Sequence, residues 1–136
     1  MRGASVPNRK IISTASPYEE RFGFSRALKI GNTISIAGTA PIGENGQTVG
    51  IGDPAAQARR CLDIIERCLG ELGASLSDVV RTRMYLTRID DAEIIGRVHG
   101  EYFRAARPVS TLLEVSRLVD PEWLIEIEAD AIVDHV

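Results

Sequence analysis

Two short runs of alternating apolar and polar residues lie on either side of Gly31-Asn32. Alternation with a period of two is typical of strands, and a two-residue Gly-Asn turn between such runs is a strong hairpin signal. The pattern therefore predicts a β-hairpin. In the first run Arg26, Leu28 and Ile30 alternate with Ser25, Ala27 and Lys29, and in the second Ile34 and Ile36 flank Ser35.

A helical period follows Asp53-Pro54, where Asp can cap the first turn and Pro fits the position whose N–H needs no partner. The apolar residues recur every three or four positions and stop at Gly73, a plausible C-terminal cap. They are Ala58, Cys61, Leu62, Ile65, Leu69 and Leu72. A second helix is predicted from Asp90 or Asp91 to Phe103, on Ile94, Ile95, Val98 and Tyr102.

Four further segments have the character of strands: Lys10 to Ser13, Val79 to Thr87, Thr111 to Arg117 and Leu124 to Val133. In the second, Val80, Thr82, Met84 and Leu86 are expected to oppose Val79, Arg81, Arg83 and Tyr85. The stretch from Ala15 to Gly23 reads as a loop because it contains Pro17, two glutamates and a closing glycine.

The order of elements predicts an α+β single domain with a mixed sheet of about six strands and two helices on one face. Each strand-helix-strand segment must cross right-handedly, which puts both helices on the same side. The opposite face then has no covering layer, so we expect subunits to associate there. Residues 1–9 are expected to form a flexible leader, and residues 10–136 the folded domain.

Composition narrows the functional classes. The formal net charge of −3 gives no basic field for nucleic acid, and no apolar segment is long enough for a membrane span. A cytoplasmic protein without membrane or nucleic-acid partners is expected. Cys61 and Cys68 are seven residues apart in one helix, beyond disulfide reach, so they are predicted to be buried free thiols.

No GxGxxG, Walker loop, HExxH, CxxC or GxSxG motif occurs, and the two histidines follow no metal spacing. We therefore expect neither a cofactor nor a metal. The most informative segment is the last strand, where Glu126, Glu128 and Asp130 share one face at a repeat of ~7 Å. Ile125, Ile127, Ala129, Ala131 and Val133 share the other face.

Two interpretations of this acidic ladder remain open. It can be a solvent-facing strand surface. If both faces of the sheet are covered, the carboxylates must instead pair with cations or shift their pKa values, with Arg81 and Arg83 as candidate partners. A carboxylate that is desolvated in a cleft between subunits also suits proton transfer or activation of water.

Several blocks, in order, resemble the Rid family, also called YjgF, from about Lys10 to Val133. They are Ser16-Pro17-Tyr18-Glu19, Gly23-Phe24-Ser25-Arg26-Ala27, Gly31-Asn32-Thr33-Ile34, Ala37-Gly38-Thr39-Ala40-Pro41, Gln57, Gly73-Ala74-Ser75-Leu76-Ser77-Asp78-Val79-Val80, Arg107-Pro108, Leu113-Glu114-Val115 and Ile125-Glu126-Ile127-Glu128-Ala129. The resemblance implies a chorismate-mutase-like fold and a homotrimer with three clefts between subunits. It also implies metal-independent hydrolysis of reactive enamines or imines to keto products and ammonia.

One departure from the family pattern bears on the substrate. The deaminating members hold the substrate carboxylate with an arginine, and in this chain Ser110 occupies that position. A serine supplies no charge, and the lost charge-assisted contact is worth on the order of 1.5 to 3 kcal/mol. The chain thus resembles the branch without the signature arginine, and its ligand need not be a 2-imino acid.

Other site positions are implied by the same resemblance. Glu126 matches the carboxylate that positions water or transfers a proton, and the Gly38 backbone and Thr39 line the site. Phe24 replaces a tyrosine, and Leu112 stands where a cysteine often lies.

Arg26 or Arg107 could replace the missing anchor, although Arg26 also suits a structural ion pair and Arg107 a loop surface. Tyr18 either edges the cleft or packs in its loop.

Three functions compete at this point. The first is an enamine or imine hydrolase that uses Glu126, and the second is a non-catalytic trimer that binds a small molecule in the same clefts. The third, ribonuclease activity, is disfavoured because the chain is acidic and offers no histidine pair for general acid–base cleavage of RNA.

Overall fold

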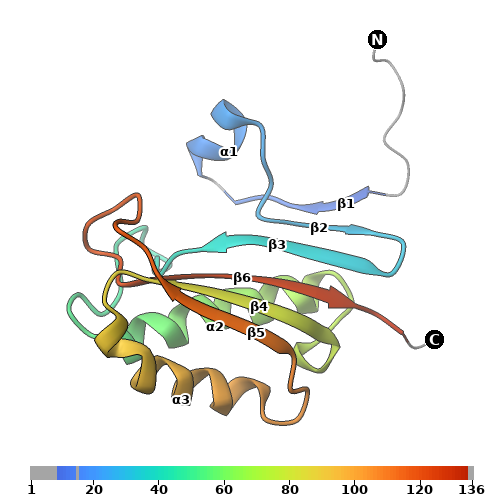
Figure 1. Cartoon of the computed structure of the whole chain (residues 1–136). Coiled ribbons are helices and arrows are strands. Elements are labelled where there is room, and N and C mark those ends of the chain that lie inside the picture. The colour runs from blue at the N-terminus through green and yellow to red at the C-terminus, as the bar shows by residue number, and fades with distance from the viewer. Residues whose placement is uncertain (1–8, 15, 135–136) are drawn as a thin grey trace.

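A computed structural model of the protein describes residues 9–14 and 16–134. Six strands form one mixed sheet in the order β1-β2-β3-β6-β4-β5. The strands are β1 (Arg9–Ile12), β2 (Ala27–Ile30), β3 (Thr33–Thr39), β4 (Val79–Leu86), β5 (Val109–Glu114) and β6 (Ile125–Ile132). Helices α2 (Pro54–Glu71) and α3 (Ala92–Phe103) lie together along the same side of this sheet (Figure 1). The predicted α+β class, sheet and pair of helices are confirmed.

The predicted hairpin is β2–β3, with Ile30 opposite Thr33 across Gly31 and Asn32. Gly31 has a φ of 59°, a left-handed value that glycine adopts without strain. Helix α2 begins as expected, because the Asp53 side chain accepts a hydrogen bond from the Ala56 N–H. Strand β5 is parallel to β4, which is the arrangement that a helical crossover requires.

Two local predictions are wrong. The segment predicted as a loop contains α1 (Pro17–Phe22), because the Ser16 side chain caps its start and Gly23, at a φ of 75°, ends it. In β4 the register shifts after Val79, so Val79 is buried and Val80 exposed, the reverse of strict alternation.

The predicted strand at residues 111–117 begins two residues earlier, at Val109, and ends at Glu114. Residues 1–8 of the predicted leader lie outside the described residues, and Arg9 belongs to β1.

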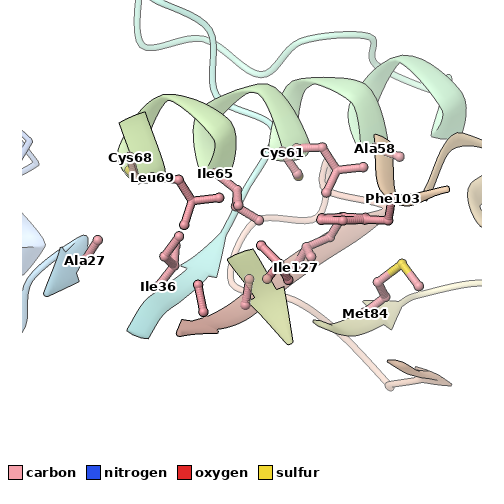
Figure 2. Close-up of a cluster of buried hydrophobic side chains, with 14 of the residues drawn as sticks. Ala27, Ile36, Ala58, Cys61, Ile65, Cys68, Leu69, Met84, Phe103 and Ile127 are labelled. Carbon is pink, nitrogen blue, oxygen red and sulfur yellow. The ribbon is translucent and has the colours of Figure 1, made fainter. Parts of the chain in front are cut away.

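The hydrophobic core lies between α2, α3 and the sheet (Figure 2). Ile65 and Leu69 of α2 and Ile127 of β6 are fully buried in it. Cys61 and Cys68 are buried free thiols, as predicted. Because every second residue of β6 enters this core, the residues between them must point to the opposite face of the sheet.

Candidate functional site

Glu126 of β6 lies directly against the backbone of Gly38 in β3. A Cβ atom added to Gly38 would stand 2.5 Å from Oε2 of Glu126 and 3.2 Å from its Cδ. The pairing of β3 with β6 is irregular at this place, between Ile36 and Thr39. A side chain at position 38 would therefore displace this carboxylate, because the carboxylate occupies the space that a Cβ atom would fill.

Arg26 also contacts the backbone of Gly38. Its Nη2 donates a short hydrogen bond to the Gly38 carbonyl oxygen, while its backbone is paired with Ile12 and Ala37. The Nε atom of Arg26 is buried and has no partner among the described residues. Arg26 is thus largely committed to the backbone of β3. This role is structural, but it uses hydrogen bonds to the backbone, and Arg26 forms none of the ion pairs found among the described residues.

The environment raises the pKa of Glu126 above its ordinary value. Burial of the carboxyl group is the main cause, and the neighbouring carboxylate of Glu128 adds to it, whereas the positive charge of Arg26 acts in the opposite direction. A carboxylate with a raised pKa holds a proton more firmly. Glu126 is therefore a better general base than a carboxylate in open water.

The rest of the acidic ladder is held by partners on β4. Arg83 Nη1 lies 3.4 Å from Oε1 of Glu128 and 3.2 Å from Oδ2 of Asp130, and the Tyr85 hydroxyl donates to Glu128 at 2.9 Å. The expectation that the carboxylates pair with a cation is confirmed for Arg83. Arg81 forms no ion pair within the described part of the chain.

A hollow of about 450 Å³ lies over this part of the sheet. Glu126 is not in its lining, although the next carboxylate along the strand is. The lining consists of Arg9, Gly23, Phe24, Ser25, Ala27, Leu28, Ser35, Ile36, Ala37, Arg83, Glu128 and Asp130.

The two aromatic candidates, Phe24 and Tyr18, are both exposed. Phe24 lines the hollow just described and also a second one of about 380 Å³ beside α1. Tyr18 stacks on Phe22, with 5.9 Å between the ring centroids, and the Arg21 guanidinium lies over both rings. Tyr18 therefore packs against residues of its own segment, which is the second of its two predicted alternatives.

The Thr39 side chain is turned inward. It is fully buried, and its hydroxyl donates to the Ala37 carbonyl oxygen at 2.8 Å. Thr39 can therefore contribute only its backbone to a site around Glu126.

Ser110 and Arg107 lie away from Glu126 in the folded chain. Ser110 is paired with Thr82 and Glu126 with Tyr85, which puts Ser110 two strands and three residues away, or ~14 Å. The Ser110 hydroxyl also lies on the helix side of the sheet, because it accepts a 2.8 Å hydrogen bond from buried Thr82. Arg107 is exposed after α3, with a φ of 50°.

Sequence reasoning missed two residues that contact Ser110, directly or through a neighbour. Thr82 Oγ1 lies 2.8 Å from Nε2 of His99 in α3 as well as from Ser110 Oγ. His99 has a lowered pKa because it is partly buried. No motif could have joined these three positions, since they come from three elements that only the fold brings together.

Two negative findings concern the described residues. None of their helices is long and apolar enough to cross a membrane. Within residues 9–14 and 16–134, no three His, Cys, Asp or Glu side chains form a group that could hold a metal ion.

Comparison with known proteins identifies many relatives. The family model described as Endoribonuclease L-PSP matches residues 14–133. The 3-aminoacrylate deaminase RutC of Acinetobacter baylyi is 39% identical over 110 residues, which cover 81% of this chain and 84% of that protein. An uncharacterized protein of Streptomyces coelicolor is 35% identical over 120 residues, 88% of this chain and 89% of its own.

Solved structures also match this chain over most of its length. A Mycobacterium tuberculosis protein described as a member of the highly conserved YjgF/YER057c/UK114 family superposes with a TM-score of 0.83 and 44% identity. The match covers 92% of this chain and 99% of that one. The Escherichia coli YjgF gene product superposes with a TM-score of 0.77 and 26% identity, over 90% and 92% of the two chains.

Proposed function

Because this chain belongs to the Endoribonuclease L-PSP (YjgF/Rid) family, we propose that it hydrolyses reactive enamine or imine metabolites in clefts between the subunits of a homotrimer. The observation that carries this proposal is the desolvated carboxylate of Glu126 against the Gly38 backbone. The deaminase among the relatives, named for 3-aminoacrylate, supports the same class of substrate.

The reaction requires one group that moves protons. The protonated Glu126 carboxyl first gives a proton to the enamine carbon, which forms the iminium ion, and water then attacks the iminium carbon. The C=N π electrons move to nitrogen while the Glu126 carboxylate accepts a proton from the water, which leaves a neutral carbinolamine. Glu126 returns that proton to nitrogen, and the C–N bond then breaks to release ammonia as the hydroxyl electrons form the C=O bond and the hydroxyl proton passes back to Glu126. A single carboxyl group can thus act in turn as acid and as base, and it ends the cycle protonated as it began.

The proposed trimer is supported by the placement of polar groups on the two faces of the sheet. Glu126 stands on the face opposite α2 and α3, whereas Ser110 stands on the helix side of edge strand β5. Residues so placed can share one cleft only if they come from two subunits. Covering the face that bears Arg83, Glu128 and Asp130 would also desolvate Glu126 further.

The test is Glu126→Gln, which keeps the shape of the side chain and removes the base. Imines with and without a carboxylate are generated by an amino acid oxidase and an amine oxidase, and the protein-dependent rate of ammonia release is measured. We expect the rate to fall to the background, while Glu66→Gln on the exposed face of α2 leaves it unchanged. Full activity of Glu126→Gln would refute the role of Glu126 as the base. No protein-dependent rate with any imine, or a single-chain particle by sedimentation, would refute the proposed function.

A non-catalytic binding trimer is the second candidate. The observation that favours it is Ser110, whose neutral hydroxyl supplies no charge to hold a substrate carboxylate. Thermal-shift screening separates the two candidates, because a sensor is stabilised by ligands that are recovered chemically unchanged. Turnover of every stabilising ligand would exclude pure binding.

A further inference from the structure

Three polar side chains, His99, Thr82 and Ser110, form a hydrogen-bonded series from α3 through β4 to edge strand β5. Thr82, fully buried in β4, is its centre, with its Oγ1 2.8 Å from His99 Nε2 and 2.8 Å from Ser110 Oγ. His99 itself packs against Phe103, with 4.6 Å between the ring centroids. The hydrogen-bonded series thus begins at the partly buried imidazole of His99 and ends at the Ser110 hydroxyl on the exposed edge of the sheet.

The available hydrogens determine which group donates at each step of this hydrogen-bonded series. The Thr82 hydroxyl has one hydrogen, and the geometry gives it to Ser110 Oγ. The contact between Thr82 and His99 must then use a proton on Nε2 of His99. Since burial lowers the pKa of His99, the ring is neutral near pH 7 and Nε2 carries its single proton.

The Ser110 hydrogen is left to point outward. The Ser110 side chain makes no other hydrogen bond among the described residues, so its O–H has no acceptor there. Each donor in the chain polarises the next, which strengthens the terminal hydroxyl as a donor. The exposed end is therefore a neutral, directed hydrogen-bond donor.

We propose that Ser110, oriented by Thr82 and His99, is a specificity-determining residue that donates a hydrogen bond to an uncharged acceptor of the ligand, such as an amide carbonyl oxygen. This inference rests on the proposed cleft between subunits. The three linked side chains carry no net charge, so they give a ligand carboxylate no ion pair. A carbonyl oxygen, in contrast, needs only the donor that Ser110 supplies.

The experiment compares two probes with the same carbon skeleton, pyruvamide and pyruvate, by isothermal titration calorimetry. We expect pyruvamide to bind more tightly. Ser110→Ala should weaken pyruvamide about 2- to 10-fold and leave pyruvate nearly unchanged, the range expected for one neutral hydrogen bond. Ser110→Arg should reverse the preference, and Ser116→Ala, in the exposed loop after β5, should change neither affinity.

Two variants of Thr82 test the orientation of the hydroxyl apart from its presence. Thr82→Val should weaken pyruvamide in the same direction as Ser110→Ala, and Thr82→Ser should restore it. Nitrogen NMR of the wild-type protein should show the His99 proton on Nε2. Tighter binding of pyruvate, no binding of either probe, equal weakening of both by Ser110→Ala, or a proton on Nδ1 of neutral His99 would overturn the inference.

Failure of this inference is distinguishable from failure of the proposed function. The probes have no C=N bond to hydrolyse, so their preference is measured without turnover and is expected to persist in Glu126→Gln. An active Glu126→Gln variant rejects only the role of Glu126, and a wild-type protein that accelerates no imine hydrolysis rejects the hydrolase alone. A wild-type enzyme that turns over imines but prefers pyruvate rejects only the role of Ser110.

Discussion

Replacing Gly38 with alanine tests whether the position of the Glu126 carboxylate matters for activity. The new Cβ would lie 2.5 Å from Oε2 of Glu126, and ordinary van der Waals contact begins at 3.4 Å, so the carboxylate must move by about 0.9 Å. It can do so because it is the end of a flexible side chain. The φ of Gly38 is not positive, so alanine adds no backbone strain.

The expected effects on stability and activity therefore differ in size. Gly38→Ala should destabilise the fold by about 1 kcal/mol, a fall of about 3 °C in the melting temperature. A displacement of about 1 Å at a reacting group lowers a rate by about 100-fold. The protein should thus remain folded and lose nearly all imine hydrolysis, measured as ammonia release beside a thermal melt.

A matched glycine provides the control. A Cβ on Gly96 in α3 would meet nothing within 4 Å, so Gly96→Ala should stabilise the helix by about 0.5–1 kcal/mol and leave activity unchanged. Adding Gly38→Ala to Glu126→Gln should produce no further loss of activity, because the group that it displaces is already inactive. Wild-type activity in Gly38→Ala would refute the reasoning.

Three further predictions concern the same molecule. The folded protein holds a proton on Glu126 more tightly than the unfolded chain does, so the stabilisation from this group is present at acidic pH and is lost as the pH rises through its raised pKa. Glu126→Gln should consequently melt above the wild type at pH 7, and the difference should vanish at acidic pH; a constant difference across pH would contradict the assigned cause. Gln57 is fully buried, and its side chain forms hydrogen bonds with the backbone of Gly50, Glu122 and Leu124. Gln57→Leu should therefore lower the free energy of unfolding, measured with urea, by about 3 kcal/mol. A loss below about 1 kcal/mol would show that these hydrogen bonds contribute little to stability. Burial raises the pKa of the Cys61 and Cys68 thiols, so both should react with a disulfide reagent only after denaturation, and rapid labelling of the native protein would disprove that protection.

Much of the fold follows from local patterns in the sequence. The Gly31-Asn32 turn, the Asp53-Pro54 helix start and the alternation in β6 each depend on neighbours within a few residues, which is why they were predictable. Helix α1 was not predicted because six residues give too short a period to distinguish from a loop. The shifted register after Val79 was not predicted because a bulge depends on the partner strand.

The sequence by itself determined the α+β class, the buried cysteines and the placement of Glu126, Glu128 and Asp130 on one face, since all of these follow from periodicity. Tertiary structure alone decided that Glu126 and Arg26 both meet Gly38, that Thr39 turns inward, and that Thr82 joins His99 to Ser110. These contacts connect residues 12 to 88 positions apart, except for the local bond of Thr39. Sheet order and crossover geometry set such distances, and no pattern within one segment contains them.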